Sequence, residues 1–214
     1  GDFDYENNCI IKAPRKEIMH RKLFTHELYP YCKIEKALSE IDINFRFSWL
    51  GIQKKIKYLL EDAIDSSVDC FIINNEKFPC LCPTMNFIHQ CIHIYNEAVL
   101  FVFSQYEPYT DTEELKLFRF IDIIKFLDIL DFDKIFHMAE EYNFLKELSF
   151  VIKICDILFP NNINSHIKDV LQLNNIDVNY FFTKDGEKKY WNISILDRMF
   201  NLKKKMDAIK KMTF

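Results

Sequence analysis

The stretch from Glu40 to Trp49 is the first candidate for chemistry, because polar and apolar side chains alternate along it without interruption. Such alternation is typical of a β-strand, whose successive side chains point to opposite faces. The polar face carries Asp42, Asn44 and Arg46. A carboxylate, an amide and a guanidinium on one face of a half-buried strand indicate that this strand could border a site. The stretch supplies one candidate acid, Asp42, and no complete site.

Two strongly apolar helical segments carry further candidates. His89 and His93 are four residues apart in the first segment, a spacing that lets two imidazoles share a metal ion. No glutamate follows His89 as in the H-E-x-x-H motif, so a hydrogen-bonded histidine of the core or of a crevice is the alternative. Arg119 and Asp122 lie among Phe, Ile and Leu in the second segment. Because charges among apolar groups are costly unless paired, we expect these two to pair with each other, or with His93 across a helix interface.

An acidic D-x-D motif stands at Asp2 and Asp4, and in a strand it would put both carboxylates on one face. A solvated acidic segment is the alternative reading, so these two residues are weak candidates for metal ligands. Cys80 and Cys82 are separated by one residue rather than the two usual in zinc sites. We therefore expect the seven scattered cysteines to be reduced thiols, packed as small apolar groups in a cytoplasmic protein.

The composition limits the partners of the chain. It has 214 residues, of which 49% are hydrophobic, enough for a real core. The net charge of -4 provides no overall field that would attract nucleic acid, so any such contact would have to be local. Three glycines leave no phosphate-binding loop of the GxGxxG kind, and no apolar run reaches the length of a membrane span.

A basic segment near the end of the chain contains Lys203 to Lys205 and then Lys210 and Lys211. The sequence predicts one helix over residues 191–212, which would put these lysines in its last turns. Lysines at that end of a helix complement the helix dipole and are usually solvated. A surface that contacts phosphate is the alternative.

The periodicity of the chain predicts an α+β fold that is predominantly helical. Strands are expected over residues 39–48, 68–73 and 78–82, in one small antiparallel sheet. A four-residue loop should join the last two strands. Helices are expected over residues 52–64, 84–103, 113–130, 133–142, 144–159, 165–173 and 191–212. The predicted domains are a partial α+β lobe over residues 1–82 and a helical domain over residues 83–214.

Four motifs in this order resemble one family. They are H-E-L-Y-P at 26–30, I-D-I-N-F at 41–45, L-C-P-T at 81–84 leading to I-H-Q-C-I-H at 88–93, and F-R-F-I-D-I at 118–123. Together they resemble the uncharacterised nucleotidyltransferases of bacteria, a branch of the polymerase-β-like superfamily. The resemblance covers roughly residues 20–160.

The resemblance implies magnesium-dependent transfer of a nucleotide from a nucleoside triphosphate, such as ATP, to an unknown acceptor. In such enzymes three carboxylates hold two Mg²⁺ ions, which orient the triphosphate and neutralise the departing pyrophosphate. Asp42 matches the third carboxylate. The family's D-x-D strand lies well upstream of it, whereas Asp2 and Asp4 stand at the very start of this chain. We therefore expect the chain to be incomplete or inactive by itself and to bind magnesium-nucleotide poorly.

The predicted site is a crevice between the strand and the helical segments. Its expected residues are Asp42 at the floor, Asn44 and Arg46 beside it, and His93, Arg119 and Asp122 on the helical wall. The chain departs from the family where Asn44 replaces a strand histidine and where Thr84 replaces an acidic residue. The alternative function is a non-catalytic module that binds a substrate or a protein partner, and a third is a helical scaffold whose polar groups are merely paired.

Overall fold

The computed structural model describes residues 2–4, 9–11, 15–16, 31–35, 37–41, 68–100, 115–183 and 187–211. The chain consists of two compact units, residues 1–62 and 63–214. The boundary between these units lies at residue 62, whereas the sequence predicts a domain boundary at residue 82. The predicted division into an α+β lobe and a helical domain stays a prediction. The predicted site residues Asp42, Asn44 and Arg46 and the predicted helix over 52–64 lie outside the described residues.

The first unit contains two antiparallel hairpins. Strand β1 (Asp2–Asp4) pairs with β2 (Cys9–Ile11), so that Asp2 is opposite Ile11 and Asp4 is opposite Cys9. Strand β3 (Tyr31–Glu35) pairs with β4 (Ala37–Ile41). The predicted strand over 39–48 thus begins within β4, and its first three residues pair with β3.

The second unit opens with a hairpin of β5 (Val68–Ile73) and β6 (Glu76–Leu81). Its turn is the dipeptide Asn74-Asn75, with φ angles of 52° and 68°. Two successive residues at positive φ are typical of the tight turn that matches the twist of a hairpin, and asparagine tolerates this conformation. The loop therefore has two residues rather than the predicted four. In the described part of the chain, separate two-stranded sheets replace the predicted three-stranded one.

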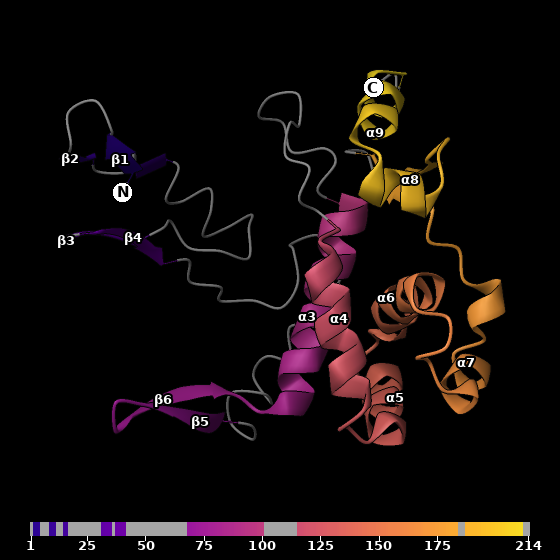
Figure 1. The fold of residues 1–214 in the computed structure, drawn as a ribbon, viewed down its shortest axis with the longest axis horizontal. Helices are drawn as coiled ribbons and strands as arrows, with labels where there is room; N and C mark the ends of the chain where they lie inside the picture. Colours follow the sequence, from indigo (N-terminus) through magenta and orange to yellow (C-terminus); the bar gives the residue numbers. More distant parts are fainter. Residues whose placement is uncertain are drawn as a thin grey trace. The chain divides into compact units, whose positions relative to one another are not determined.

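Helix α3 (Pro83–Leu100) is the centre of the second unit. It contacts α4 (Leu117–Leu127), α6 (Leu145–Leu158) and β7 (Tyr180–Phe182), and Figure 1 shows α4 and α6 alongside it. Proline is well suited to the first position of a helix because the amide hydrogen it lacks has no partner there. Thr84 therefore lies inside the helix. Ten of the side chains of α3 are buried: Met85, Phe87, Ile88, Cys91, Ile92, Ile94, Tyr95, Asn96, Ala98 and Val99.

The described residues also form two shorter helices and a 3-10 turn. Helix α5 (Phe132–Glu141) contacts α6 and is capped by Asp131, whose carboxylate accepts a hydrogen bond from the Lys134 amide. Helix α7 (Ser165–Val170) is capped by Asn164 and is followed by the turn Leu173–Asn175.

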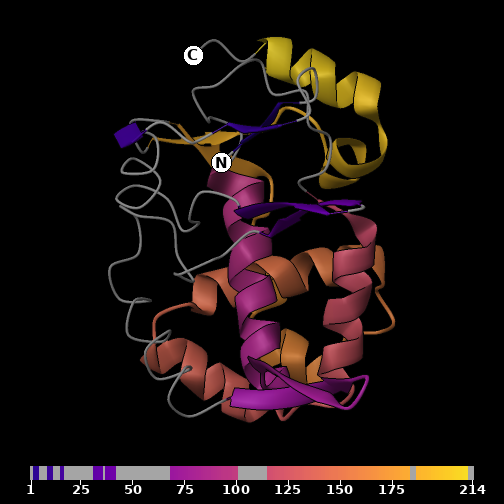
Figure 2. The same ribbon diagram turned by 90° about the vertical axis from the view of Figure 1, so that its left-hand side faces the viewer.

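The end of the chain differs from the single helix predicted over 191–212. Strand β7 pairs with β8 (Lys188–Tyr190), and two helices follow, α8 (Ile195–Phe200) and α9 (Leu202–Lys211). The break is at Asn201, whose side chain accepts a hydrogen bond from the Lys204 amide at 3.1 Å and so caps α9. Figures 1 and 2 show α8 and α9 at the C-terminal end of α3.

The predicted α+β class with mainly helical content is confirmed. The described residues form seven α-helices and small antiparallel sheets. Five cysteines are free thiols: Cys70, Cys80, Cys82, Cys91 and Cys155. None of the described helices combines the length and the apolar character that crossing a membrane requires.

Candidate functional site

The side of α3 that is not fully buried carries a line of polar residues. They are Asn86, His89, Gln90, His93 and Glu97, all of intermediate exposure. Residues three and four apart lie above one another on a helix, so these side chains form one stripe, about 16 Å long at 1.5 Å per residue. Within it Asn86 accepts a hydrogen bond from Gln90 at 3.3 Å, and the parallel rings of His89 and His93 are 5.9 Å apart.

Glu97 is the centre of this polar stripe. Its Oε1 lies 3.0 Å from Nε2 of His93, and its Oε2 accepts a hydrogen bond from Nη1 of Arg119. One carboxylate therefore joins an imidazole of its own helix to a guanidinium of α4. The three side chains are 18% to 26% exposed, so a ligand in solution can still reach them.

Helix α4 brings Arg119 to the stripe because its apolar side packs against the core. Phe120 and Ile123 are buried on that side, and α4 contacts both α3 and α6. Arg119 precedes Phe120 and is in the first turn of α4, so its position is fixed by the packing of its neighbours. The sequence analysis expected Arg119 to pair with Asp122 or with His93, whereas the ion pair found uses Glu97.

The charge on Glu97 is stabilised by its two partners. Burial alone would raise the pKa of this carboxyl, but the hydrogen bond and charge of His93, together with Arg119, outweigh burial and lower the pKa below its usual value. Glu97 is therefore anionic at neutral pH. An anionic carboxylate on Nε2 of His93 favours the tautomer with its proton there and leaves Nδ1 as the basic nitrogen.

This arrangement can serve two kinds of chemistry. An imidazole in hydrogen-bond contact with a carboxylate is a candidate for taking a proton from a reacting hydroxyl group. A guanidinium has the forked donors that bind a phosphate through two parallel hydrogen bonds. His93, Glu97 and Arg119 thus combine a candidate base with a candidate phosphate ligand.

The other predicted site residues are placed as follows. Asp122 is on α4, one turn beyond Arg119, and is partly exposed; no hydrogen bond or ion pair joins it to Arg119 among the described residues. Asp2 and Asp4 are both in β1. Asp42, Asn44 and Arg46 are not among the described residues, so the crevice that would unite them with the helical wall stays a prediction. The structure thus brings together His93 and Arg119 of the predicted set.

Glu97 was missed at the sequence level. The signal for it was its spacing, since a glutamate four residues after a histidine shares the same face of a helix. The spacing from His93 to Glu97 equals the spacing from His89 to His93, so all three side chains lie on the same face of α3.

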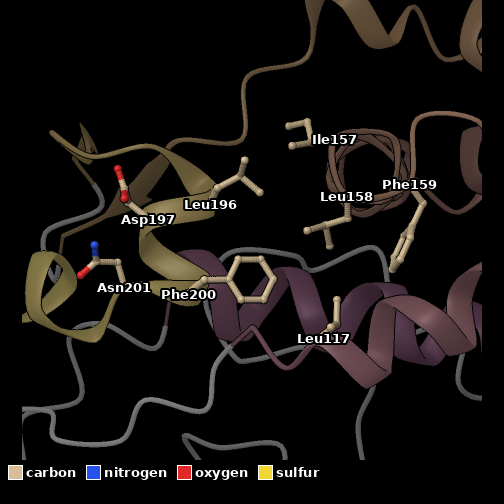
Figure 3. Close-up of a pocket in the computed structure, with 8 residues that line it drawn as sticks. All are labelled: Leu117, Ile157, Leu158, Phe159, Leu196, Asp197, Phe200 and Asn201. Atoms are coloured by element: carbon tan, nitrogen blue, oxygen red, sulfur yellow. The ribbon is translucent and has the colours of Figure 1, made fainter.

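A groove of about 690 Å³ lies next to the beginning of α4. It is lined by Leu117, Ile157, Leu158, Phe159, Leu196, Asp197, Phe200 and Asn201. In Figure 3 the ring of Phe200 points toward Leu158, whereas Asp197 and Asn201 are farther from that apolar wall. Asp197 is paired with Lys204 at 2.8 Å, and none of the lining residues that the structure describes is cationic. These described residues therefore supply no cation that would hold a phosphate.

Comparison with known proteins gives one result for function. A search of curated proteins and a search of solved structures each found no significant match. The family model described as "Uncharacterised nucleotidyltransferase" matches residues 4–160. The matched range includes α3, α4 and the whole His93, Glu97 and Arg119 cluster. Because the match covers well over half of the chain, the protein belongs to the uncharacterised nucleotidyltransferase family.

Proposed function

We propose that the protein binds a nucleoside triphosphate such as ATP at the polar stripe of α3 and takes part in transferring a nucleotide to an acceptor. One observation carries this proposal. Arg119 of α4 reaches the stripe at Glu97, inside the residues that the family model matches. Membership of the uncharacterised nucleotidyltransferase family supports nucleotidyl transfer as the reaction.

Arg119 is the proposed phosphate ligand. Its guanidinium contacts Glu97 in this structure, and a triphosphate would compete with that carboxylate for the same forked donors. Exchange of one anionic partner for another leaves the guanidinium paired in both states. Arg119 can therefore bind a phosphate without the cost of an unpaired charge in the free protein.

His93 is the proposed proton acceptor. In nucleotidyl transfer, the acceptor hydroxyl oxygen bonds to the α-phosphorus, the bond to pyrophosphate breaks, and the hydroxyl proton must leave. His93 would take this proton, and its contact with Glu97 holds the imidazole in place. The anionic Glu97 would then stabilise the imidazolium that forms.

Magnesium is retained as the proposed metal on the family resemblance, with Asp42 as its first ligand and Asp2 and Asp4 as weaker candidates. Within the described residues, no group of three His, Cys, Asp or Glu side chains could hold a metal ion. No step of the reaction is therefore assigned to the metal. Asn44, Arg46 and Asp122 are further proposed substrate ligands.

The second candidate is a non-catalytic module that binds a substrate or a protein partner. It is favoured by the same contacts, because Glu97 neutralises Arg119 and also engages His93. Polar groups that satisfy one another need no ligand. The two candidates differ in whether a nucleotide can displace Glu97 from Arg119.

Calorimetric titration with ATP, with and without magnesium, tests the proposal. We expect weak binding by the 214-residue chain, lowered about tenfold further by Arg119→Ala. Lys125→Ala, an exposed cation two turns later on α4, is the matched control and should leave binding unchanged. Equal losses in the two variants, or no ATP binding by the wild type at millimolar concentration, would favour the non-catalytic module. Micromolar binding abolished by Asp42→Ala would contradict the expectation that the catalytic half is incomplete.

A further inference from the structure

The β5–β6 hairpin exposes several large apolar side chains. Phe71 is 46% exposed, Ile72 64%, Ile73 51% and Phe78 38%. The rings of Phe71 and Phe78 stack across the two strands, with their centroids 5.4 Å apart. Figure 1 shows the hairpin extending from the beginning of α3. A two-stranded hairpin is marginally stable by itself, so a further strand on one of its edges would stabilise it.

The turn determines which backbone groups of the hairpin point outward. In a hairpin with a two-residue turn, the residues on either side of the turn exchange both of their backbone hydrogen bonds. Ile73 and Glu76 are that pair here. Hydrogen-bonded and non-hydrogen-bonded pairs alternate along an antiparallel ladder. The next pair, Ile72 and Lys77, is therefore non-hydrogen-bonded, and its amide and carbonyl groups point away from the hairpin, as do those of every second pair beyond it.

Two observations at the pair of Cys70 and Pro79 agree with this assignment. The pair is two residues beyond Ile72 and Lys77, so its backbone groups should also point outward. Proline has no amide hydrogen for the ladder, and it is tolerated in a strand where that position faces outward. The Cys70 amide donates a hydrogen bond to the carboxylate of Asp69 at 2.7 Å, so it is directed away from β6.

The two edges of the hairpin differ in how well they are protected. On the β6 edge, Pro79 lacks a donor and Lys77 has a charged side chain, and both features are typical of edges that resist pairing. The β5 edge has neither proline nor lysine, and it presents the outward amides of Val68, Cys70 and Ile72. Among the described strands only β6 pairs with β5. The edge of β5 is therefore the one that can accept another strand.

This edge is complementary to a second copy of itself. Antiparallel pairing about a two-fold axis at Cys70 puts Cys70 opposite Cys70 and Val68 opposite Ile72, so every outward amide meets an outward carbonyl. Asp69 is then opposite Phe71, and no two like charges are directly opposite one another. The Cys70 amide exchanges the carboxylate of Asp69 for a main-chain carbonyl, so it is satisfied both in the single chain and in the pair.

We propose that the β5 strands of two copies of this chain pair edge to edge and form a four-stranded antiparallel sheet in a homodimer. The exposed Ile72 would pack on one face of that sheet, and the Phe71 rings of the two copies would meet diagonally on the other face. This inference goes beyond the proposed nucleotide transfer and does not depend on it, because no predicted site residue belongs to β5 or β6.

Sedimentation equilibrium under reducing conditions tests this dimer, at protein concentrations of about 1–100 µM. We expect dissociation in the micromolar range, because pairing of two strand edges buries a small area. Ile72→Pro removes an outward amide of β5 but no hydrogen bond of the hairpin, and it should weaken the dimer at least about tenfold. Lys77→Pro is the matched control, since Lys77 is directly opposite Ile72 and its amide points to the β6 edge; this variant should keep the dimer. A monomeric wild type, or equal weakening by both prolines, would overturn the proposal.

Cross-linking of Cys70, an exposed thiol, tests the register of the two strands. In the proposed sheet the two Cys70 Cα atoms are about 5.5 Å apart. A short bismaleimide should therefore join Cys70 of one copy to Cys70 of the other, as identified by peptide mass spectrometry. The linkage should be retained in Lys77→Pro and lost in Ile72→Pro, which keeps the thiol. Equal yields in these two variants would show chance collisions of an exposed thiol and would rule out the paired strands.

Discussion

Arg198 donates a hydrogen bond from Nη2 to the carbonyl oxygen of Ala98, and so joins α8 to the last turns of α3 across 100 residues of sequence. Its guanidinium carbon is also 4.4 Å from the ring centroid of Trp191. The side chain is fully buried. A cation is favourable at this end of α3, because the last carbonyl groups of a helix carry partial negative charge. Arg198 therefore attaches the C-terminal elements to the central helix.

Substitution of Arg198 should weaken this attachment. Arg198→Met keeps an apolar chain of similar length but removes every donor, and we expect it to lower the free energy of unfolding by about 2 kcal/mol. Urea unfolding followed by circular dichroism measures the change. Arg198→Lys, which keeps the charge and loses the planar fork, should recover only part of it. A stability equal to that of the wild type in both variants would contradict the role of Arg198.

Glu97 should make the protein less stable in acid. Its pKa is lower in the folded protein than in the unfolded chain, so its contribution is present above about pH 4.5 and is lost as the pH falls through the folded pKa. We expect Glu97→Gln to cost about 1 kcal/mol at pH 7 and to approach the wild type as the pH falls through the folded pKa of Glu97. Chemical unfolding at several pH values tests this. Glu141→Gln on α5, where the side chain is exposed, is the control, and a pH dependence as large as that of Glu97→Gln would refute the assignment.

Glu147 should have the opposite effect. Burial raises the pKa of this α6 carboxyl to about 7, so the folded protein holds a proton that the unfolded chain releases above about pH 4.5. The contribution of Glu147 to the free energy of unfolding is therefore fully present below about pH 4.5, and it falls as the pH rises toward 7. Glu147→Gln should add roughly 2 kcal/mol at pH 8 and little at pH 4, as measured by urea unfolding. A gain of the same size at both pH values would show that titration of Glu147 is not its cause.

Asn96 offers a route to higher stability. It is 1% exposed, and neither polar atom of its side chain has a hydrogen-bond partner among the described residues. Asn96→Leu removes these buried polar atoms at similar volume and should raise the free energy of unfolding by about 1 kcal/mol. Thermal unfolding is the measurement. Asn86→Leu, at a partly exposed position where the side chain bonds to Gln90, should bring no gain, and a larger gain there would contradict the explanation.

Much of the helical unit could be predicted because its helices are long and strongly periodic. The burial of α3 follows from a run that is apolar nearly all round, and α6 lies within one residue of its predicted bounds. The cost of leaving charges unpaired among apolar side chains predicted that Arg119 is paired, but its partner is Glu97 and not Asp122 or His93. These inferences depend on the local pattern and on a general energetic rule.

Other features could not be derived because they depend on tertiary partners. The predicted helix over 191–212 contains no proline or glycine, and its break at Asn201 becomes intelligible only when α9 is seen to pack on the β7–β8 hairpin. The choice of Glu97 rather than Asp122 as the partner of Arg119 depends on how α4 is placed against α3. Neither the break at Asn201 nor the pairing of Arg119 with Glu97 can be predicted from the spacing of residues along one helix.

The bond from Arg198 to Ala98 also sets an order of events during synthesis of the protein. Helix α3 is made early, but its covering partners follow much later, with α6 starting 45 residues beyond the end of α3 and Arg198 still later. At about 5–20 residues per second, the ribosome needs roughly 5–20 s to pass from Ala98 to Arg198. During that interval the apolar sides of α3 have only part of their final cover. The nascent chain should therefore need protection from a chaperone until α8 has emerged.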